Sequence, residues 1–308
     1  MRSDSSLVPL AAAALLVTAS LGEALGVVLQ ARGGPSDADW TAVASTLRAE
    51  LAPTDGLLVG TRWIEPVARQ KLGDSLLTRE RLGAPVATWP RLTMVAEAGH
   101  GSIPEGYLVE GRTRVGALEL TRARAAAPFV VLARLEGLLR GAVASVDTGG
   151  RDEPCTWSAF GPVSGNLGTG PALPSERFLC LGAFVARSVV TDTTYAAHDA
   201  VYMDVPGDGR TLVVRWTAMP LGSTLRGGFG LYVEAERDGK GAPITLEWRV
   251  DDRSLATLTH RDGEGWKRFE VPTGAAPGAT GMLEMRVRSP GGSRRWFGVS
   301  AAVLEATR

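Results

Sequence analysis

The chain has 308 residues, of which 44% are hydrophobic and 21% charged, a composition ordinary for a folded protein and a length sufficient for two domains. The 33 lysine and arginine residues are balanced by 33 aspartate and glutamate residues, so the formal net charge is +0. Nucleic acids and anionic lipid surfaces attract proteins with a basic excess. The balance therefore removes any global electrostatic case for either partner, and we expect no nucleic acid to bind.

The N-terminus carries a long apolar run. Residues 7–22 hold no charge and follow Arg2, and apolar residues resume after Glu23. A signal-peptide core needs roughly 7–15 apolar residues and a spanning helix roughly 20, so the run lies between the two. We expect residues 1–30 to be a signal peptide or a membrane anchor formed by residues 7–29; a buried core helix is the alternative. The protein is then exported, and is periplasmic or extracellular.

Residues 31–126 predict a small α/β domain. Apolar residues recur there with a helical period after a capping residue, and short apolar segments of the strand kind lie between the helical ones. Strands that alternate with helices indicate a sheet that is partly parallel. One expected helix is capped by Ser36 or Asp37, and a second covers Ile64–Leu72. The expected strands are Leu57–Val59, Arg91–Ala96 and Gly116–Thr121.

The segment from Asp39 to Val59 resembles the small extracytoplasmic domain of multi-spanning glycosyltransferases that use lipid-linked sugars (the GT-C type). In that family a helix that begins with a tryptophan, here Trp40, precedes a Pro-Gly-Asp turn and an apolar strand; this chain has Pro53-Thr54-Asp55-Gly56 at the turn. The later segment Trp89–Val95 is similar to another strand of such domains. Those enzymes keep their catalytic acid in a large helical membrane region, which has no counterpart in this sequence. The resemblance implies an envelope-glycan setting rather than glycosyl transfer.

An alanine- and arginine-rich run, Arg122–Pro128, marks the boundary to a second domain over residues 127–308. Apolar and polar residues alternate there in segment after segment, separated by Gly- and Pro-rich turns. Alternation buries every second side chain, so we expect two antiparallel sheets of at least eight strands, packed as a jelly-roll-like, all-β sandwich. Its general look resembles non-catalytic carbohydrate-binding modules. The expected strands include Phe129–Leu135, Leu138–Val146, Leu212–Trp216, Phe229–Val233, Ile244–Val250, Leu283–Val287 and Phe297–Val303.

The chain has two cysteines, Cys155 and Cys180, which lie 25 residues apart in polar, Gly/Pro-rich sequence. Neither has a Cys or His at metal-ligand spacing. In an exported protein such a pair closes a loop, so we expect a disulfide that contributes about 3 kcal/mol by restricting the unfolded chain. Two separate buried thiols are the alternative.

No catalytic motif stands out in the sequence. His100, in Gly-His-Gly-Ser, is by default a loop histidine, and neither a Gly-x-Ser-x-Gly elbow nor a phosphate-binding loop is present. Two carboxylates about 5–9 Å apart can hydrolyse glycosides, and Glu65 with Glu97, or Glu234 with Glu247, are candidate pairs. We expect the second pair to lie on a solvated sheet face, and the chain to be no enzyme.

We expect no cofactor and no catalytic metal. A structural Ca²⁺ ion stays open as an alternative, because four aspartates lie in turn-like sequence, although without EF-hand spacing. These residues are Asp204, Asp208, Asp251 and Asp252.

The tryptophans indicate a binding surface. Trp216 and Trp248 are in phase with aliphatic neighbours and should be core. Trp266 and Trp296 are out of phase with theirs, so their rings should point outward, as should Tyr232 on its own strand. Exposed rings can stack on sugars, and an arginine such as Arg295 beside Trp296 can donate hydrogen bonds to hydroxyls. The alternative is that a loop or the small domain covers these rings.

Three functional hypotheses follow. The leading one is a non-catalytic, exported cell-envelope protein whose sandwich binds carbohydrate. In the second, the same aromatic residues dock an interaction subunit onto a membrane protein of glycan assembly. The third is a glycoside hydrolase, which two carboxylates facing each other in a cleft, one with a raised pKa, would favour.

Overall fold

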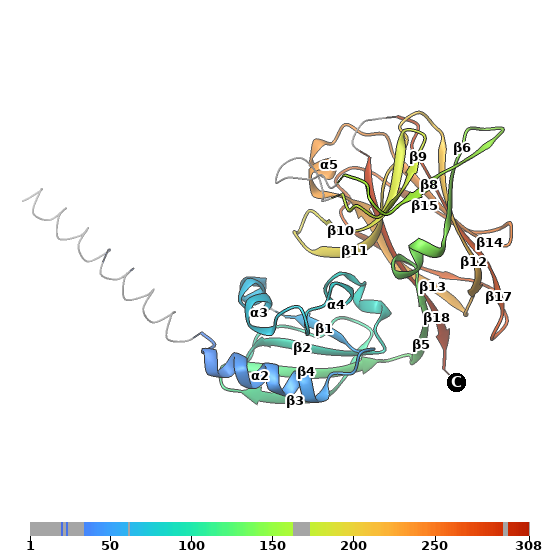
Figure 1. The fold of residues 1–308 in the computed structure, drawn as a ribbon. Helices are drawn as coiled ribbons and strands as arrows, with labels where there is room; N and C mark the ends of the chain where they lie inside the picture. Colours follow the sequence, from blue (N-terminus) through green and yellow to red (C-terminus); the bar gives the residue numbers. More distant parts are fainter. Residues whose placement is uncertain are drawn as a thin grey trace, which may run out of the picture.

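The computed structural model describes Ser20, Glu23 and residues 34–60, 62–162, 173–291 and 295–307. Apart from Ser20 and Glu23, the predicted signal peptide or anchor at residues 7–29 lies outside this part. Among the described residues, no helix is both long enough and apolar enough to cross a membrane. Figure 1 shows a small domain of helices and strands beside a larger domain made almost wholly of strands.

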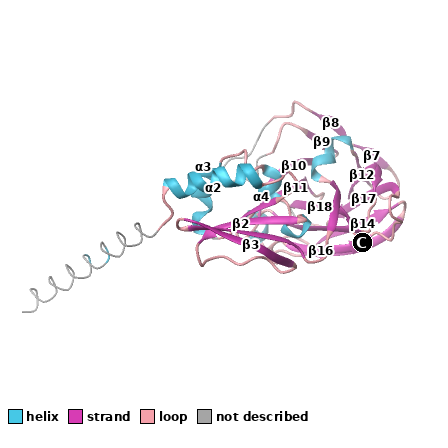
Figure 2. Cartoon of the chain, turned by 90° about the horizontal axis from the view of Figure 1, so that it is seen from below, coloured by secondary structure: helices cyan, strands magenta, loops and turns pink. Residues whose placement is uncertain are grey.

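The small domain is a four-stranded sheet with helices α2 and α3 on one face (Figure 2). The strand order is β1-β2-β4-β3, with β1 parallel to β2 and the other pairs antiparallel, so the expected partly parallel sheet is present. The elements are α2 (Asp37–Glu50), β1 (Gly56–Val59), η1 (Arg62–Ile64), α3 (Glu65–Leu72), α4 (Arg79–Gly83), η2 (Val86–Thr88), β2 (Arg91–Glu97), β3 (Tyr107–Val115) and β4 (Leu118–Ala125).

Local sequence explains the start of α2. The Ser36 hydroxyl accepts a hydrogen bond from the Asp39 N–H, and the Asp39 carboxylate accepts one from the Ser36 N–H, which is a reciprocal capping box. The apolar positions of the helix, Trp40 among them, are buried as their spacing predicts. Strand β3 was not predicted, because most of its side chains are exposed and no alternating pattern marks it.

The larger domain is a β-sandwich, which confirms the predicted fold class of a small α/β domain plus an all-β sandwich. One sheet has the order β16-β13-β18-β11-β10-β9-β8, with β5 also paired to β18; the other has the order β15-β14-β17-β12-β6-β7. The elements are β5 (Phe129–Arg134), η3 (Glu136–Gly141), β6 (Val143–Asp147), β7 (Asp152–Pro154), β8 (Thr156–Ser158), β9 (Arg177–Cys180), β10 (Ala183–Thr191), β11 (Ala197–Asp204), β12 (Thr211–Pro220), β13 (Thr224–Leu231), α5 (Val233–Asp238), β14 (Ile244–Val250), β15 (Arg253–His260), β16 (Lys267–Pro272), β17 (Thr280–Arg288) and β18 (Trp296–Ala306).

Alternation places the core between the two sheets. Every second residue of β14 is buried, and Trp216 and Trp248 lie in the core as predicted. The predicted disulfide between Cys155 and Cys180 is also present, next to the paired strands β8 and β9.

Two expected strands are corrected by the structure. Residues 136–141 form the 3-10 helix η3, so β6 begins only at Val143. Strand β13 ends at Leu231 and helix α5 follows, which places Glu234 on a helix instead of a sheet face. The helix buries the carboxylate of Glu236, which lies 2.6 Å from Nε2 of His260 and accepts the N–H of Gly263. These bonds hold the chain in a helical turn that alternation cannot reveal.

The small domain docks against strands β10 and β11, where helix α4 lies beside β11 (Figures 1 and 2). Asp199 of β11 is 1% exposed at this junction. Its carboxylate accepts hydrogen bonds from Nε of Arg79 (2.7 Å), in the small domain, and from Nε of Arg187 (3.1 Å), in the sandwich. Arg187 also donates to Glu80 of the small domain at 2.7 Å. One buried carboxylate thus links both domains.

A second buried carboxylate fills a split in the larger sheet. Strand β18 pairs with β11 over residues 296–299 and with β5 over residues 302–306. At the two residues between these stretches, Glu136 accepts hydrogen bonds from the Ser300 hydroxyl (2.8 Å) and the Ala301 N–H (3.5 Å). Burial raises the pKa of Glu136 to about 7.

Asp199→Asn should weaken the domain junction. Two guanidinium groups lose their shared anion, and breaking a buried pair costs about 3 kcal/mol. We expect the free energy of unfolding to fall by that amount in urea titrations and limited proteolysis to cleave the small domain faster. Glu65→Gln, which removes an exposed pair with Arg69, is the control and should change neither. An unchanged urea midpoint for Asp199→Asn would contradict the assignment.

Glu136 should make stability depend on pH. Its carboxyl has an ordinary pKa of 4.5 in the unfolded chain and about 7 in the folded one. Between these values the folded chain retains a proton that the unfolded chain has lost, so stability falls as the pH rises from about 4.5 to about 7. The loss is about 3 kcal/mol. Glu136→Gln should lack this decline when urea unfolding is measured across the range; a decline as steep as that of the wild type would exclude Glu136 as its source.

Candidate functional site

Aromatic side chains gather on the outer face of the larger sheet. Here Tyr202 and Trp296 have the opposite strand phase to the core residues Val201 and Phe297, so their rings lie on the side away from the other sheet. We call this cluster the aromatic face; its members are Leu173, Phe184, Val190, Ala200, Tyr202, Tyr232, Trp266 and Trp296. The three aromatic residues selected from the sequence, Trp266, Trp296 and Tyr232, thus lie in one cluster, each partly exposed.

The side chain of Trp266 is held in place by the residues packed around its indole. Its indole lies against two glycines of β13, where a Cβ on Gly228 or Gly230 would come within 2.2 Å or 3.0 Å of the ring. The imidazole of His198 stacks on the indole, with ring centroids 3.8 Å apart and an interplanar angle of 1°. Small residues on one strand and a stacked ring from another therefore hold the indole.

Asp192 orients His198. The carboxylate lies 2.9 Å from Nε2 of the imidazole and also accepts the N–H groups of Thr194 and Ala196. Burial opposes ionisation of Asp192, but the hydrogen bonds from His198 and Thr194 outweigh it and lower the pKa to about 2. A charged carboxylate therefore fixes the ring that covers one side of Trp266.

Tyr232 and Trp296 form the other half of the aromatic face. Tyr232 lies at the start of α5 rather than on the expected strand. Its N–H donates to the Trp296 carbonyl at 2.9 Å, and the two rings meet at 65° with centroids 6.3 Å apart. Backbone pairing thus holds both rings in an edge-to-face arrangement.

The structure places Arg295 away from this surface, which corrects its predicted contact with a ligand. It is 1% exposed, and its Nη1 donates to Asp262 at 2.7 Å. The alternation that turns Trp296 outward turns the residue before it inward. Arg294, its neighbour, lies outside the described residues.

Two exposed groups beside the aromatic face were not found from the sequence. Tyr195, in the β10–β11 hairpin, is 66% exposed, and the guanidinium of Arg237 lies 5.0 Å from its ring centre. Tyr195 has a φ of 61° in a hairpin without glycine or proline, so no turn signal marked it. The stacking of His198 on Trp266 could not be found from the sequence either, because the two residues lie far apart in the chain.

The other candidate residues are dispersed. Glu65 pairs with Arg69, and His100 is an exposed loop residue whose ring lies 6.0 Å from that of Trp63. Among the described residues, no three His, Cys, Asp or Glu side chains gather in a way that could hold a metal ion. Of the four aspartates considered for Ca²⁺, Asp208 pairs with Arg210, and Asp204 is partly buried with a raised pKa.

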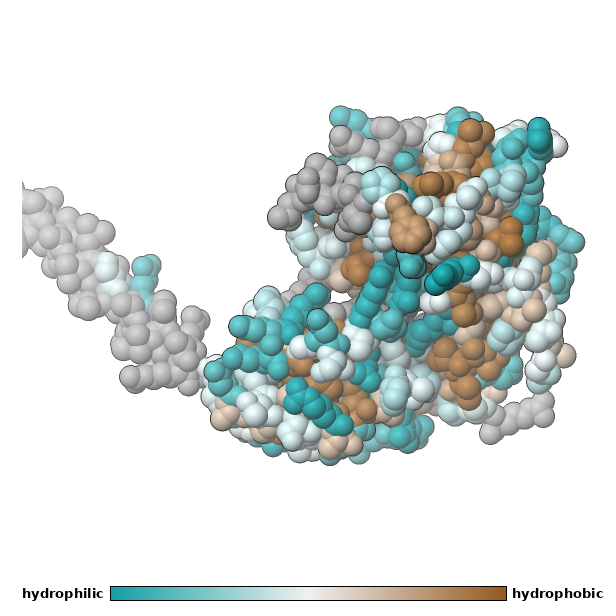
Figure 3. Space-filling view, viewed as in Figure 1, coloured by the Kyte–Doolittle hydropathy of each residue, from teal (hydrophilic) through white to brown (hydrophobic). Residues whose placement is uncertain are grey.

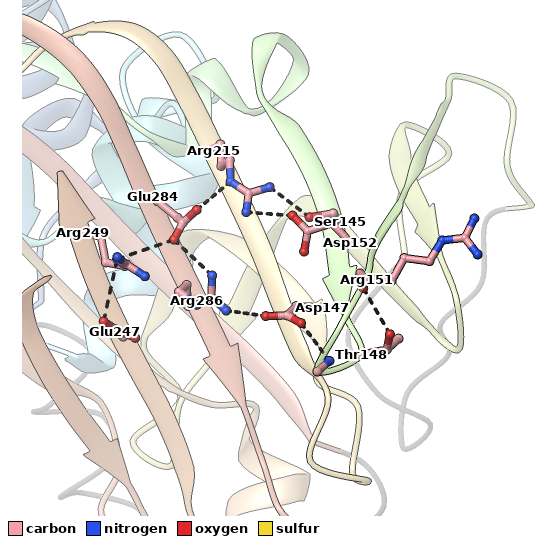
Figure 4. Close-up of polar contacts among 11 residues, drawn as sticks. Ser145, Asp147, Thr148, Arg151, Asp152, Arg215, Glu247, Arg249, Glu284 and Arg286 are labelled. Carbon is pink, nitrogen blue, oxygen red and sulfur yellow. Dashed lines mark hydrogen bonds and ion pairs between the residues drawn. The ribbon is translucent and has the colours of Figure 1, made fainter. Parts of the chain in front are cut away.

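The opposite outer face, on the smaller sheet, carries ion pairs (Figure 4). Glu284 of β17, with a side chain only 7% exposed, lies 2.6 Å from Arg215 and 3.3 Å from Arg286. Arg215 also forms an ion pair with Asp152, and Arg286 forms one with Asp147. Glu247, one of the candidate catalytic carboxylates, lies in this charged face 4.0 Å from Arg249. The two outer faces of the sandwich therefore differ in chemistry.

No protein-family profile matches this chain, and no curated protein matches it. Among solved structures, a CBM51 module from Clostridium perfringens GH95, in complex with methyl-galactose, is 12% identical with a TM-score of 0.26, covering 40% of this chain and 81% of its own. The CBM51-2 and INT domains of Clostridium perfringens ZmpB, in complex with GlcNAc, are 9% identical with a TM-score of 0.29, covering 66% of this chain and 42% of theirs.

A glycoside hydrolase family 43 arabinoxylan arabinofuranohydrolase from Bacillus subtilis is 9% identical with a TM-score of 0.27, covering 70% of this chain and 41% of its own. At such scores these likenesses carry no argument about ligand or activity. None of the three structures supports the resemblance of the small domain to glycosyltransferases, which stays a prediction.

Gly228→Ala should displace Trp266 without removing it. The added methyl group would lie 2.2 Å from the indole Nε1, so the ring must move off the stack with His198. We expect a loss of stability of about 1–3 kcal/mol and, in NMR spectra, a shift of the His198 ring protons as they leave the indole ring current. Gly111→Ala is the control, because a Cβ there meets nothing within 4 Å. Unshifted His198 signals would contradict the packing described.

Proposed function

We propose that this chain is a non-catalytic, exported cell-envelope protein whose β-sandwich binds glycan through the aromatic face. The observation that carries the proposal is that Trp266 (the residue before β16), Trp296 (of β18) and Tyr232 (at the start of α5) lie partly exposed around one hydrophobic cluster. Pre-positioned aromatic rings can stack on the apolar faces of sugars at little cost in conformational entropy.

Neighbouring groups support a carbohydrate ligand. Tyr195 presents a largely exposed ring beside the guanidinium of Arg237, so a further ring and a hydrogen-bond donor lie at the edge of the surface. His198 stacks on the indole of Trp266 and the two glycines of β13 lie against the same ring, so a ligand can reach only the part of the indole that these contacts leave uncovered. Sugar sites combine such rings with a few polar groups.

Export rests on two features. The disulfide between Cys155 and Cys180 is of a kind that persists in oxidising compartments. The uncharged run over residues 7–22 has the composition of an export signal or an anchor.

The second candidate function is an interaction subunit that docks the aromatic face on a membrane protein. The edge-to-face pair of Tyr232 and Trp296 favours this alternative to some degree, since aromatic residues are also enriched at protein interfaces. A glycoside hydrolase has less support. Glu136 has the raised pKa of a catalytic acid, but its acidic neighbour Asp199 is already bound by two arginines.

Glycan-array binding tests the proposal. The full chain should bind a subset of glycans, and Trp266→Ala and Trp296→Ala should each weaken that binding about tenfold, equivalent to 1.4 kcal/mol. Trp63→Ala is the matched control, because Trp63 is 64% exposed on the small domain. Folded protein that binds no glycan would refute the proposal, and equal losses in all three variants would refute the assigned surface.

A further inference from the structure

A cleft of about 420 Å³ lies on the sandwich where it meets the small domain, which contributes Arg79 to the lining. We call it the interdomain cleft; it is lined by Arg79, Glu136, Gly137, Leu139, Arg140, Trp157, Pro174, Ser175, Glu176 and Arg187. Its volume falls in the range of about 300–1,000 Å³ typical of small-molecule sites, which often lie between domains. Figure 3 shows hydrophilic side chains in the hollow between the two domains. None of the lining residues belongs to the aromatic face.

Three arginines from different elements line the cleft: Arg79 from α4, Arg140 from η3 and Arg187 from β10. Arg79 uses only its Nε, for Asp199, while Arg187 uses its Nε and Nη2. Arg140 is exposed and has neither a hydrogen bond nor an ion pair with any other described residue. Several guanidinium N–H groups at the cleft therefore have no partner within the described part of the chain.

The acids that pair with Arg79 and Arg187 are not among the residues that line the cleft. Asp199 is buried in the domain junction, and neither it nor Glu80 lines the cleft. The cleft itself is lined by three arginines and two glutamates, Glu136 and Glu176, so that positive side chains are in excess there. Guanidinium groups match the geometry of carboxylate and phosphate, which they bind with two parallel hydrogen bonds.

The remaining walls suit a polyhydroxylated molecule. Ser175 and Glu176 bring polar side chains to the cleft, whereas the carboxylate of Glu136 is buried against Ser300 and Ala301. Trp157 adds an aromatic wall and is held in place by Phe178, whose ring meets the indole edge-on at 4.9 Å. The raised pKa of Glu136 leaves this carboxyl protonated and uncharged below about pH 7, so it does not repel an anion there.

We propose that the interdomain cleft binds a monosaccharide that carries one anionic group, a carboxylate or a phosphate, with Arg140 as the main contact to that group. This site is separate from the aromatic face, and its existence does not depend on glycan binding there. It makes the junction of the two domains a binding element as well as a structural one.

Isothermal titration calorimetry of the full chain, below the pKa of Glu136, tests the proposal with four probes: glucuronate, glucose 1-phosphate, glucose and inorganic phosphate. Glucuronate and glucose 1-phosphate should bind at least about tenfold more tightly than glucose or inorganic phosphate. Arg140→Gln should reduce the affinity for both anionic sugars to that for glucose. Arg140 has no described partner to lose, so the fold should be retained, as the thermal midpoint would verify.

Arg151→Gln is the matched control. Arg151 is exposed in the β6–β7 hairpin, where it pairs with Glu153 (Figure 4 shows its position), and its loss should leave all affinities unchanged. Equal affinities for glucose and glucuronate, or equal losses in the two arginine variants, would overturn the proposal. Inorganic phosphate that binds as tightly as glucose 1-phosphate would overturn its sugar component. If Trp296→Ala abolished binding of the anionic sugars, the site would be the aromatic face and the cleft would be excluded.

Discussion

One buried carboxylate joins the two domains where helix α4 meets strand β11. Asp199 accepts hydrogen bonds from Arg79 of the small domain and Arg187 of the sandwich, and it is almost wholly removed from water. A buried anion is tolerated only when cations and hydrogen bonds compensate its lost hydration. Asp199 therefore requires both arginines, and this requirement sets the position of helix α4 on strand β11. The interdomain cleft exists because the domains meet at this point.

The sandwich presents different chemistry on its two outer faces. On the smaller sheet, Glu284 and its arginines satisfy one another, so that little hydrogen-bonding capacity is left for a ligand. On the larger sheet, partly exposed rings have large apolar surfaces and few polar groups of their own. A ligand gains more free energy by covering apolar area than by breaking satisfied ion pairs. This difference is why we propose glycan binding at the aromatic face.

Alternation in the sequence was enough to predict the sandwich, the burial of Trp216 and Trp248, and the outward phase of Trp296, because strand periodicity is local. The same rule, applied one residue earlier, would have placed Arg295 inside. Other features depend on partners that are distant in sequence. Glu236 bends the chain into α5 through His260 and Gly263, and Trp266 rests on glycines of β13. The interdomain cleft could not be predicted because its arginines come from two domains.

The place of β18 in the larger sheet has a consequence for how the protein acquires its structure. This strand pairs with β13 on one side and with β11 and β5 on the other, and it is synthesised after all three. Until it arrives, the central position of the sheet is vacant and Glu136 lacks Ser300 and Ala301. The sheet therefore forms by closing long loops, which is intrinsically slow. The larger sheet therefore cannot be completed until β18 is available, whatever structure the other strands have already formed.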